Sequence, residues 1–348
     1  MVGYLNPLQT ADGKPDGAPV YEATEILKLL LHANKHPDLP HFLILDEMNL
    51  SHVERYFNDF LSGMELSDKK KALKLHSAGL AKTREGLDVE GCIDFPENLF
   101  VIGTVNIDET TYMFSPKVLD RANVIECRPT ITQLKEAAKN LNSGSTKGEI
   151  EMASEQTAKD FLKLAVKARE HSWVAGESQP PERDWEDFLK NLHEMSEQIL
   201  EPAGLELTYR PQKEILAYAR VDYYFHREGG EVAGAASGGA TGGVETDEQD
   251  SETKAPEGEG GPVVAAAGES APAAASSAAW DWQRCLDEQI MQKILPKLTG
   301  NERKLRDVLG KLKEFCEDPK RVGGHRLSHA KILQMQRRLE TDRFTGYF

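Results

Sequence analysis

Cysteine is scarce in this chain of 348 residues, which contains four: Cys92, Cys127, Cys285 and Cys316. They lie far apart and form no CxxC pair. This spacing argues against a zinc ribbon and against a disulfide framework, which need paired or numerous cysteines. We therefore expect reduced thiols and a cytoplasmic protein.

Long apolar runs and an excess of positive charge are also absent. No apolar run approaches the roughly 18 residues of a membrane span, and the first residues do not resemble a signal peptide, so no membrane association is expected. The formal net charge is −15. Such a charge argues against a protein that coats nucleic acid or anionic lipid non-specifically.

Large apolar residues are almost missing from residues 228–279, which are mostly Gly, Ala, Ser and Glu. This segment has ten acidic residues against one lysine. It cannot bury enough apolar surface to offset the entropy lost on ordering, so we predict a disordered acidic insert.

Short apolar runs alternate with helix-compatible segments in the first 130 residues, which predicts a parallel α/β sheet. We expect strands buried on both faces at 42–45 and 99–105, a third strand at 123–127, and helices at 21–33 and 51–65. After Pro129 the pattern is helical. The expected helices are 154–173, 184–200, 212–225, 280–316 and 328–339, and those on either side of the insert are expected to pack together.

Two acids, Asp46 and Glu47, directly follow the first apolar strand in the stretch HFLILDEMNLSHVERYF. Ligands of open parallel sheets bind beyond the carboxyl ends of the strands. In nucleotide hydrolases the first acid of such a pair holds Mg²⁺, and the second can act as a general base toward water. The alternative is that these acids simply cap the helix that follows.

Two further residues suit the same chemistry. Asn106 ends the strand LFVIGTVN, where its amide can orient the attacking water, although Asn at this position can also simply form a turn. Arg121 follows a short helix and can act as an arginine finger in a neighbouring subunit. The alternative for Arg121 is a salt bridge to Asp120 or Glu126.

The order of these motifs resembles the McrB-like branch of the AAA+ proteins. The matching segments are DEMN (46–49), PENLFVIGTVN (96–106), LDR (119–121), VGYLNPL (2–8), LTYRPQKEILAYA (207–219), QIMQKILPKLTG (289–300) and RRLETDRFTGYF (337–348). Together they cover nearly the whole chain except the insert.

The resemblance implies a fold class and a division into domains. Residues 1–130 would form a partial AAA+ P-loop NTPase core with the Walker B, sensor 1 and arginine-finger segments. Residues 131–227 and 280–348 would form two parts of a C-terminal α-helical lid, separated by the insert at 228–279.

The resemblance also implies roles for individual residues. Asp46 would bind Mg²⁺, Glu47 would activate water, Asn106 would sense the γ-phosphate, and Arg121 would act from a neighbouring protomer of a hexamer-type homo-oligomeric ring. Arg210 is the candidate sensor-2 residue of the lid. The family further implies a motor of a DNA restriction or defence system, with an McrC-like nuclease subunit and indirect contact with DNA.

The chain departs from the family in two respects. The family's MNTADRS segment reads VNIDETTY here, so ATP becomes the default nucleotide, with GTP as the alternative. No GxxxxGK[ST] loop occurs, and that loop supplies the amides and the lysine that hold the phosphates.

The absence of this loop has consequences for the function. We expect an N-terminally truncated member that lacks the central strand, binds ATP poorly by itself and exposes an uncovered apolar sheet face. The competing hypothesis is a non-enzymatic interaction module with a degenerate AAA+ core.

Overall fold

The computed structural model describes residues 2–348 except 11–12, 14–16, 67–72, 79, 107–111, 128, 130, 132–133, 136–137, 139–152, 171, 174–178, 228–278 and 323. It contains two compact units. The first comprises Met1–Ile125, Ile150–Val221 and Asp281–Phe348, and the second comprises Glu126–Glu149 and Asp222–Trp280. The predicted insert lies outside the described residues up to residue 278. In the second unit, the indole nitrogen of Trp280 donates to Asp222 at 2.9 Å.

The chain is a mixed α/β protein whose described strands form one four-stranded sheet and three two-stranded sheets. The strands are β1 (Gly3–Thr10), β2 (Pro19–Ala23), β3 (His41–Leu45), β4 (Leu73–Lys74), β5 (Leu80–Lys82), β6 (Asp88–Glu90), β7 (Cys92–Ile93), β8 (Leu99–Gly103), β9 (Gly300–Asn301) and β10 (Phe344–Thr345). The four-stranded sheet has the order β1-β2-β5-β6. β1 pairs antiparallel with β2, and β2 pairs parallel with β5.

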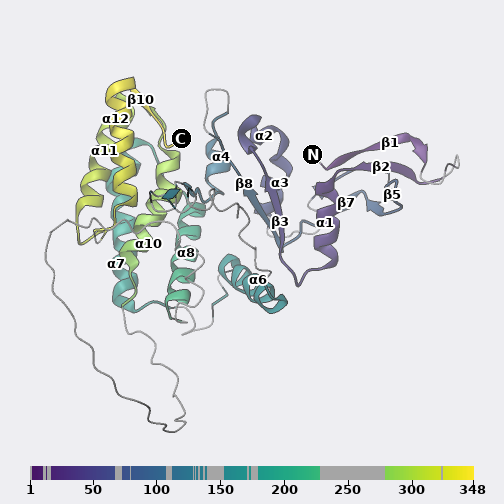
Figure 1. The fold of residues 1–348 in the computed structure, drawn as a ribbon, viewed down its shortest axis with the longest axis horizontal. Helices are drawn as coiled ribbons and strands as arrows, with labels where there is room; N and C mark the ends of the chain where they lie inside the picture. Colours follow the sequence, from purple (N-terminus) through teal and green to yellow (C-terminus); the bar gives the residue numbers. More distant parts are fainter. Residues whose placement is uncertain are drawn as a thin grey trace, which may run out of the picture. The chain divides into compact units, whose positions relative to one another are not determined.

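β3 and β8 form a separate parallel pair, with His41 opposite Leu99 and Leu45 opposite Gly103 (Figure 1). Side chains alternate between the two faces of a strand. Leu43 points into the core and is 7% exposed, whereas Ile44 is 63% exposed. The expectation that this strand is buried on both faces is therefore wrong. In the described part of the chain β3 has one neighbouring strand, and no second layer covers Ile44.

The strand expected at 123–127 is not formed. Residues 122–127 have no regular secondary structure, and Ile125 is 74% exposed. The backbone N–H of Val124 donates to the carbonyl of Gln292 at 3.2 Å instead of joining a ladder. A strand needs a neighbour for its backbone groups, and none of the described strands lies beside this segment.

The helices of the first 125 residues pack against one side of the β3–β8 pair and share one apolar core. They are α1 (Glu25–Lys35), the 3₁₀ turn η1 (Met48–Leu50), α2 (Val53–Tyr56), α3 (Asn58–Glu65) and α4 (Pro116–Leu119). Leu27 and Leu30 of α1 are fully buried, and the rings of Phe57 and Phe60 stack at 4.9 Å. Burial of such side chains stabilises the fold by about 1.5–3 kcal/mol each.

Two expected helix boundaries differ from the structure. The helix expected from Tyr21 starts at Glu25 because Tyr21 belongs to β2 and Thr24 caps the helix, accepting from the Leu27 N–H. The helix expected at 51–65 is divided at Phe57, whose φ of −108° and ψ of 4° are not helical. The stacked Phe57 ring is 2% exposed, so the break places a large side chain in the core.

The rest of the first unit is mostly helical, apart from the short antiparallel pair of β9 and β10. The elements are α6 (Glu155–Glu170), α7 (Glu182–Met195), the π-helical turn η2 (Ser196–Leu200), η3 (Glu201–Ala203), α8 (Tyr209–Arg227), α10 (Trp282–Gln289), the π-helical turn η4 (Ile290–Ile294), η5 (Leu295–Lys297), α11 (Glu302–Glu317) and α12 (Leu327–Asp342). The single helix expected at 280–316 is two helices. Pro296 and the strand residue Gly300 lie at the interruption, where a helix cannot continue.

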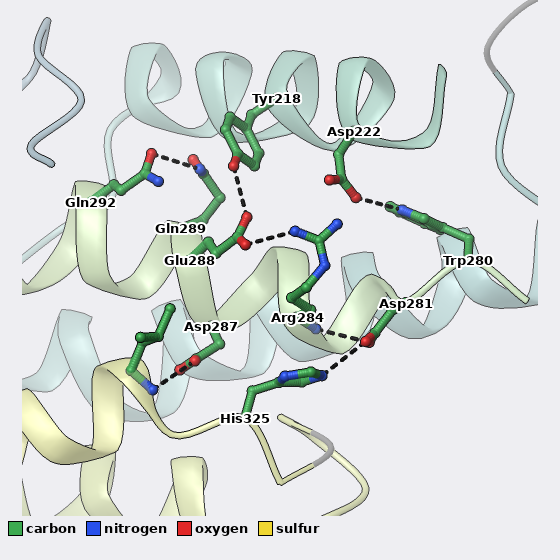
Figure 2. A network of polar contacts seen from close by, with 11 residues as sticks. Tyr218, Asp222, Trp280, Asp281, Arg284, Asp287, Glu288, Gln289, Gln292 and His325 are labelled. Carbon is green, nitrogen blue, oxygen red and sulfur yellow. Dashed lines mark hydrogen bonds and ion pairs between the residues drawn. The ribbon is translucent and has the colours of Figure 1, made fainter. Parts of the chain in front are cut away.

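A polar network connects these helices (Figure 2). The hydroxyl of Tyr218 on α8 donates to Glu288 on α10 at 2.7 Å, and Glu288 also accepts from Arg284 at 2.6 Å. Asp281 caps α10 by accepting from the Arg284 N–H at 3.0 Å and pairs with His325 at 2.9 Å. These contacts hold α8, α10 and the segment before α12 together.

None of the helices in the described ranges has both the length and the apolar character needed to cross a membrane.

Candidate functional site

The parallel pairing of β3 and β8 brings two chain segments together at one sheet edge. Because parallel strands end on the same side, the residues after Leu45 and after Gly103 are neighbours. The Thr104 N–H donates to the Leu45 carbonyl at 3.0 Å, and the Met48 N–H donates to the Thr104 carbonyl at 2.8 Å. Backbone bonds therefore continue past the strands and fix the position of both segments.

The two acids are held by a residue that the sequence did not single out. The hydroxyl of Thr104 donates to Oδ1 of Asp46 at 2.5 Å and accepts from the Glu47 N–H at 2.9 Å. One side chain thus contacts both acids. Asp46 and Glu47 are solvent-exposed, so their carboxylates remain open to a ligand.

Glu47 adopts the left-handed backbone conformation, with φ 49° and ψ 49°. This conformation costs a residue other than glycine about 1–2 kcal/mol. The turn directs the Glu47 carboxylate to Asn106, whose amide donates to it at 3.1 Å. The side chain of Met48 packs over Gly103, where an added Cβ would lie 2.5 Å from the sulfur of Met48.

Asn49 fixes the other side of this turn. Its side chain is 3% exposed and donates to the carbonyl of Asn106 at 2.8 Å, while its own carbonyl accepts from the Tyr112 N–H at 3.0 Å. The segment after β8 is therefore tied to the segment after β3 by side chains from both. Glu47 occupies the N-cap position of η1 but makes no capping bond with its side chain. The simple helix-capping interpretation does not describe these acids.

The two arginines lie together in a different cluster. Arg121 follows α4, and its guanidinium forms an ion pair with Glu65 at the end of α3. It also donates to the carbonyl of Lys117. Arg210 in the first turn of α8 binds the same Glu65 oxygen at 2.9 Å. Burial of Arg121, together with the positive charge of Arg210, lowers the pKa of Arg121.

The alternative partner Asp120 pairs with Lys297 at 2.5 Å, not with Arg121. The structure therefore arranges the expected residues in two groups. Asp46, Glu47 and Asn106 meet at the sheet edge, and Arg121 and Arg210 meet at Glu65. Within the described residues, no hydrogen bond or ion pair joins the two groups.

Sequence reasoning missed Thr104, Asn49 and Glu65. Thr104 and Asn49 lie inside the motifs GTVN and DEMN, so their proximity to the acids was a usable signal. Glu65 lies 145 residues from Arg210, and no local pattern connects them. In the described ranges, no group of three or more His, Cys, Asp or Glu residues is placed to hold a metal ion.

The comparisons with known proteins add one match. Residues 270–344 match the model of a domain of unknown function (DUF8727). This match covers α10, α11 and α12 and contains none of the candidate site residues. No curated protein matches the chain. No solved structure matches it.

Proposed function

We propose that this chain carries the water-activating half of a nucleoside triphosphatase site of the AAA+ class, of McrB-like type. The observation that supports the proposal most is the contact between Asn106 and Glu47 at the carboxyl end of two parallel strands. A carboxylate that accepts from a fixed neutral amide and is otherwise open to solvent suits a general base that must hold one water molecule.

Glu47, Asn106 and Asp46 have different proposed roles, which follow from their positions. Glu47 takes a proton from the attacking water, and the amide of Asn106 restrains the carboxylate in one orientation. Asp46 is an exposed carboxylate with one oxygen bound to Thr104 and can hold Mg²⁺ directly or through water. Mg²⁺ bound there would neutralise part of the negative charge of the phosphates. A single carboxylate is a weak site for Mg²⁺, a hard ion that keeps several waters and takes phosphate oxygens as further ligands.

The phosphates need a binding loop, and the 348-residue sequence contains no GxxxxGK[ST] motif to supply it. The exposed apolar face of the β3–β8 pair supports the proposal that a further strand and helix pack against it. Phe42, Ile44 and Ile102 on this face are 47%, 63% and 48% exposed. Phe161 of α6 covers one end by contacting Phe42 at 5.9 Å between ring centroids. A strand and helix carrying the phosphate loop would cover the remaining apolar surface.

Assembly and biological role follow from the same proposal. Arg121 would complete a neighbour's site in a homo-oligomeric ring of hexamer type, with contacts running head to tail. Arg210 would couple the helical lid to the nucleotide. ATP is proposed over GTP. A role in DNA restriction or defence, with an McrC-like nuclease subunit and indirect DNA contact, belongs to the proposal.

The test is steady-state hydrolysis of Mg·ATP and Mg·GTP by the complete gene product that contains this chain. Glu47→Gln should lower kcat by at least about 100-fold, because a general base contributes 10²–10⁴-fold, and should leave nucleotide binding intact. Glu90→Gln on β6 is the matched control, since Glu90 is exposed and lies outside both groups. An inactive wild-type product would reject the enzyme and favour an interaction module. Equal activity in both variants would reject Glu47 as the base.

A further inference from the structure

Glu65 is the charged residue that holds Arg121 and Arg210 together. It is the last residue of α3, and its Oε1 contacts guanidinium nitrogens of both arginines. The side chains of Glu65, Arg121 and Arg210 are 33%, 14% and 40% exposed, so the cluster is partly withdrawn from water. Charge-assisted bonds in such surroundings are stronger than those on an open surface.

The neighbouring carboxylates already have other cations as partners. Glu214 on α8 pairs with Lys293, whose side chain is 1% exposed. Asp120 pairs with Lys297, whose side chain is 18% exposed. Glu65 is therefore the carboxylate that separates the two like-charged arginines. Its loss would remove the carboxylate that contacts both Arg121 and Arg210 and leave their like charges close together.

The same contacts direct Arg121 back toward its own chain. Its guanidinium donates to the carbonyl of Lys117 on α4, and its Nε is buried. An arginine finger has to extend from its own surface to the phosphate of a neighbouring protomer. The observed arrangement is incompatible with that reach, so the ion pair with Glu65 must open first.

We propose that Glu65 is a positioning residue that holds Arg121 and Arg210 in an intramolecular ionic latch, and that this latch keeps Arg121 from a neighbouring active site. The latch as a regulatory contact rests on the proposed function, whereas the shielding of the two arginines does not. A phosphate group is the competing ligand expected to open the latch, because its oxygens can pair with a guanidinium in place of the Glu65 carboxylate.

The first experiment measures shielding directly in the 348-residue chain. Phenylglyoxal labels arginine, and mass spectrometry gives the rate at each position, with exposed Arg303 as the internal reference. Glu65→Gln should raise the labelling rate at Arg121 and Arg210 by at least about tenfold, the factor expected when a charge-assisted bond no longer resists local opening. Asp59→Asn, exposed on the same helix, should change neither rate. Unchanged labelling of Arg121 in Glu65→Gln overturns the latch.

A salt titration of the wild type avoids the risk that Glu65→Gln unfolds. Raising NaCl to about 1 M shortens the screening length to about 3 Å and should raise labelling at Arg121 and Arg210 relative to Arg303. Circular dichroism at each salt concentration establishes that the helices remain folded. A labelling ratio independent of salt contradicts an ionic latch.

The second experiment measures turnover of the complete gene product as a function of protein concentration. Glu65→Gln should reach half-maximal ATP hydrolysis at a lower protein concentration than wild type or Asp59→Asn. Faster labelling together with lower turnover at every concentration overturns the latch as an inhibitory contact. If the wild type does not hydrolyse nucleotide, the proposed function fails, while the labelling result still decides whether Glu65 shields the arginines.

Discussion

Asp287 on α10 offers the clearest test of what stabilises the helical part of the chain. Its carboxylate is 1% exposed and accepts from the backbone N–H groups of Leu327 at 3.0 Å and Ser328 at 3.1 Å, and from the Ser328 hydroxyl. The N-cap residue of α12, Arg326, makes no capping bond with its side chain. A buried acid distant in sequence therefore caps the first turn of α12.

Replacing Asp287 with alanine should destabilise the fold strongly. A helix cap contributes about 0.5–2 kcal/mol, and each buried donor left without a partner costs about 1–3 kcal/mol. Since these contributions overlap, we expect Asp287→Ala to lower the free energy of unfolding by about 3–5 kcal/mol. Asp287→Asn retains an acceptor oxygen but not the charge, so a smaller loss of about 1–2 kcal/mol is expected.

The assay is urea unfolding of the 348-residue chain, followed by far-ultraviolet circular dichroism. Asp307→Ala on α11 is the control, because Asp307 is 77% exposed and its pair with Lys311 should add nothing measurable. A loss below about 1 kcal/mol in Asp287→Ala would refute the reasoning, since ordinary substitutions reach that size. An identical loss in Asp287→Ala and Asp287→Asn would show that the acceptor oxygen has no role.

Three further predictions concern single side chains. Thr104→Val removes the hydroxyl that binds Asp46 and should lower turnover of the complete gene product by about 10–100-fold, whereas Thr104→Ser should retain most activity. Equal losses in the two variants would exclude the hydroxyl as the cause. Burial raises the pKa of Cys316 to about 12, so a thiol reagent at neutral pH should modify the exposed Cys127 and leave Cys316 unmodified until the chain unfolds. Similar modification rates at the two cysteines would contradict the burial of Cys316. Burial lowers the pKa of His41 below its ordinary 6.5, so the unfolded chain binds this proton more readily than the folded chain, and stability should fall as the pH drops below about 6.5. His41→Gln should make the melting temperature depend less steeply on pH in this range, and an unchanged slope would exclude His41 as the source of the dependence.

The elements that could be predicted from the sequence are those that local residue patterns specify. The apolar run before Asp46 forms β3, and Leu27 and Leu30 of α1 point inward at helical spacing. The errors arose where a neighbour decides the outcome. The segment at 123–127 reads as a strand, but none of the described strands is available to pair with it. Likewise, Ile44 is exposed because the layer that would cover it is not among the described elements.

The candidate site divides in the same way. Asp46, Glu47 and Asn106 were expected near one another because the carboxyl ends of parallel strands share an edge, and the structure places them there. Their catalytic roles stay a proposal. The left-handed turn at Glu47 was not predictable, since glutamate gives no signal for φ 49°. Thr104 compensates for this turn by accepting from the Glu47 N–H.

The two halves of the site also differ in how firmly the fold determines them. Backbone hydrogen bonds from Thr104 to Leu45 and from Met48 to Thr104 fix the sheet-edge group. Glu65 and its two arginines are instead joined only through long side chains, and such pairs can exchange partners without moving the backbone. A substitution at Glu65 should therefore release the arginines and leave the contact between Asn106 and Glu47 intact. Under the proposed function, the latch could therefore open without disturbing the residues that are proposed to activate water.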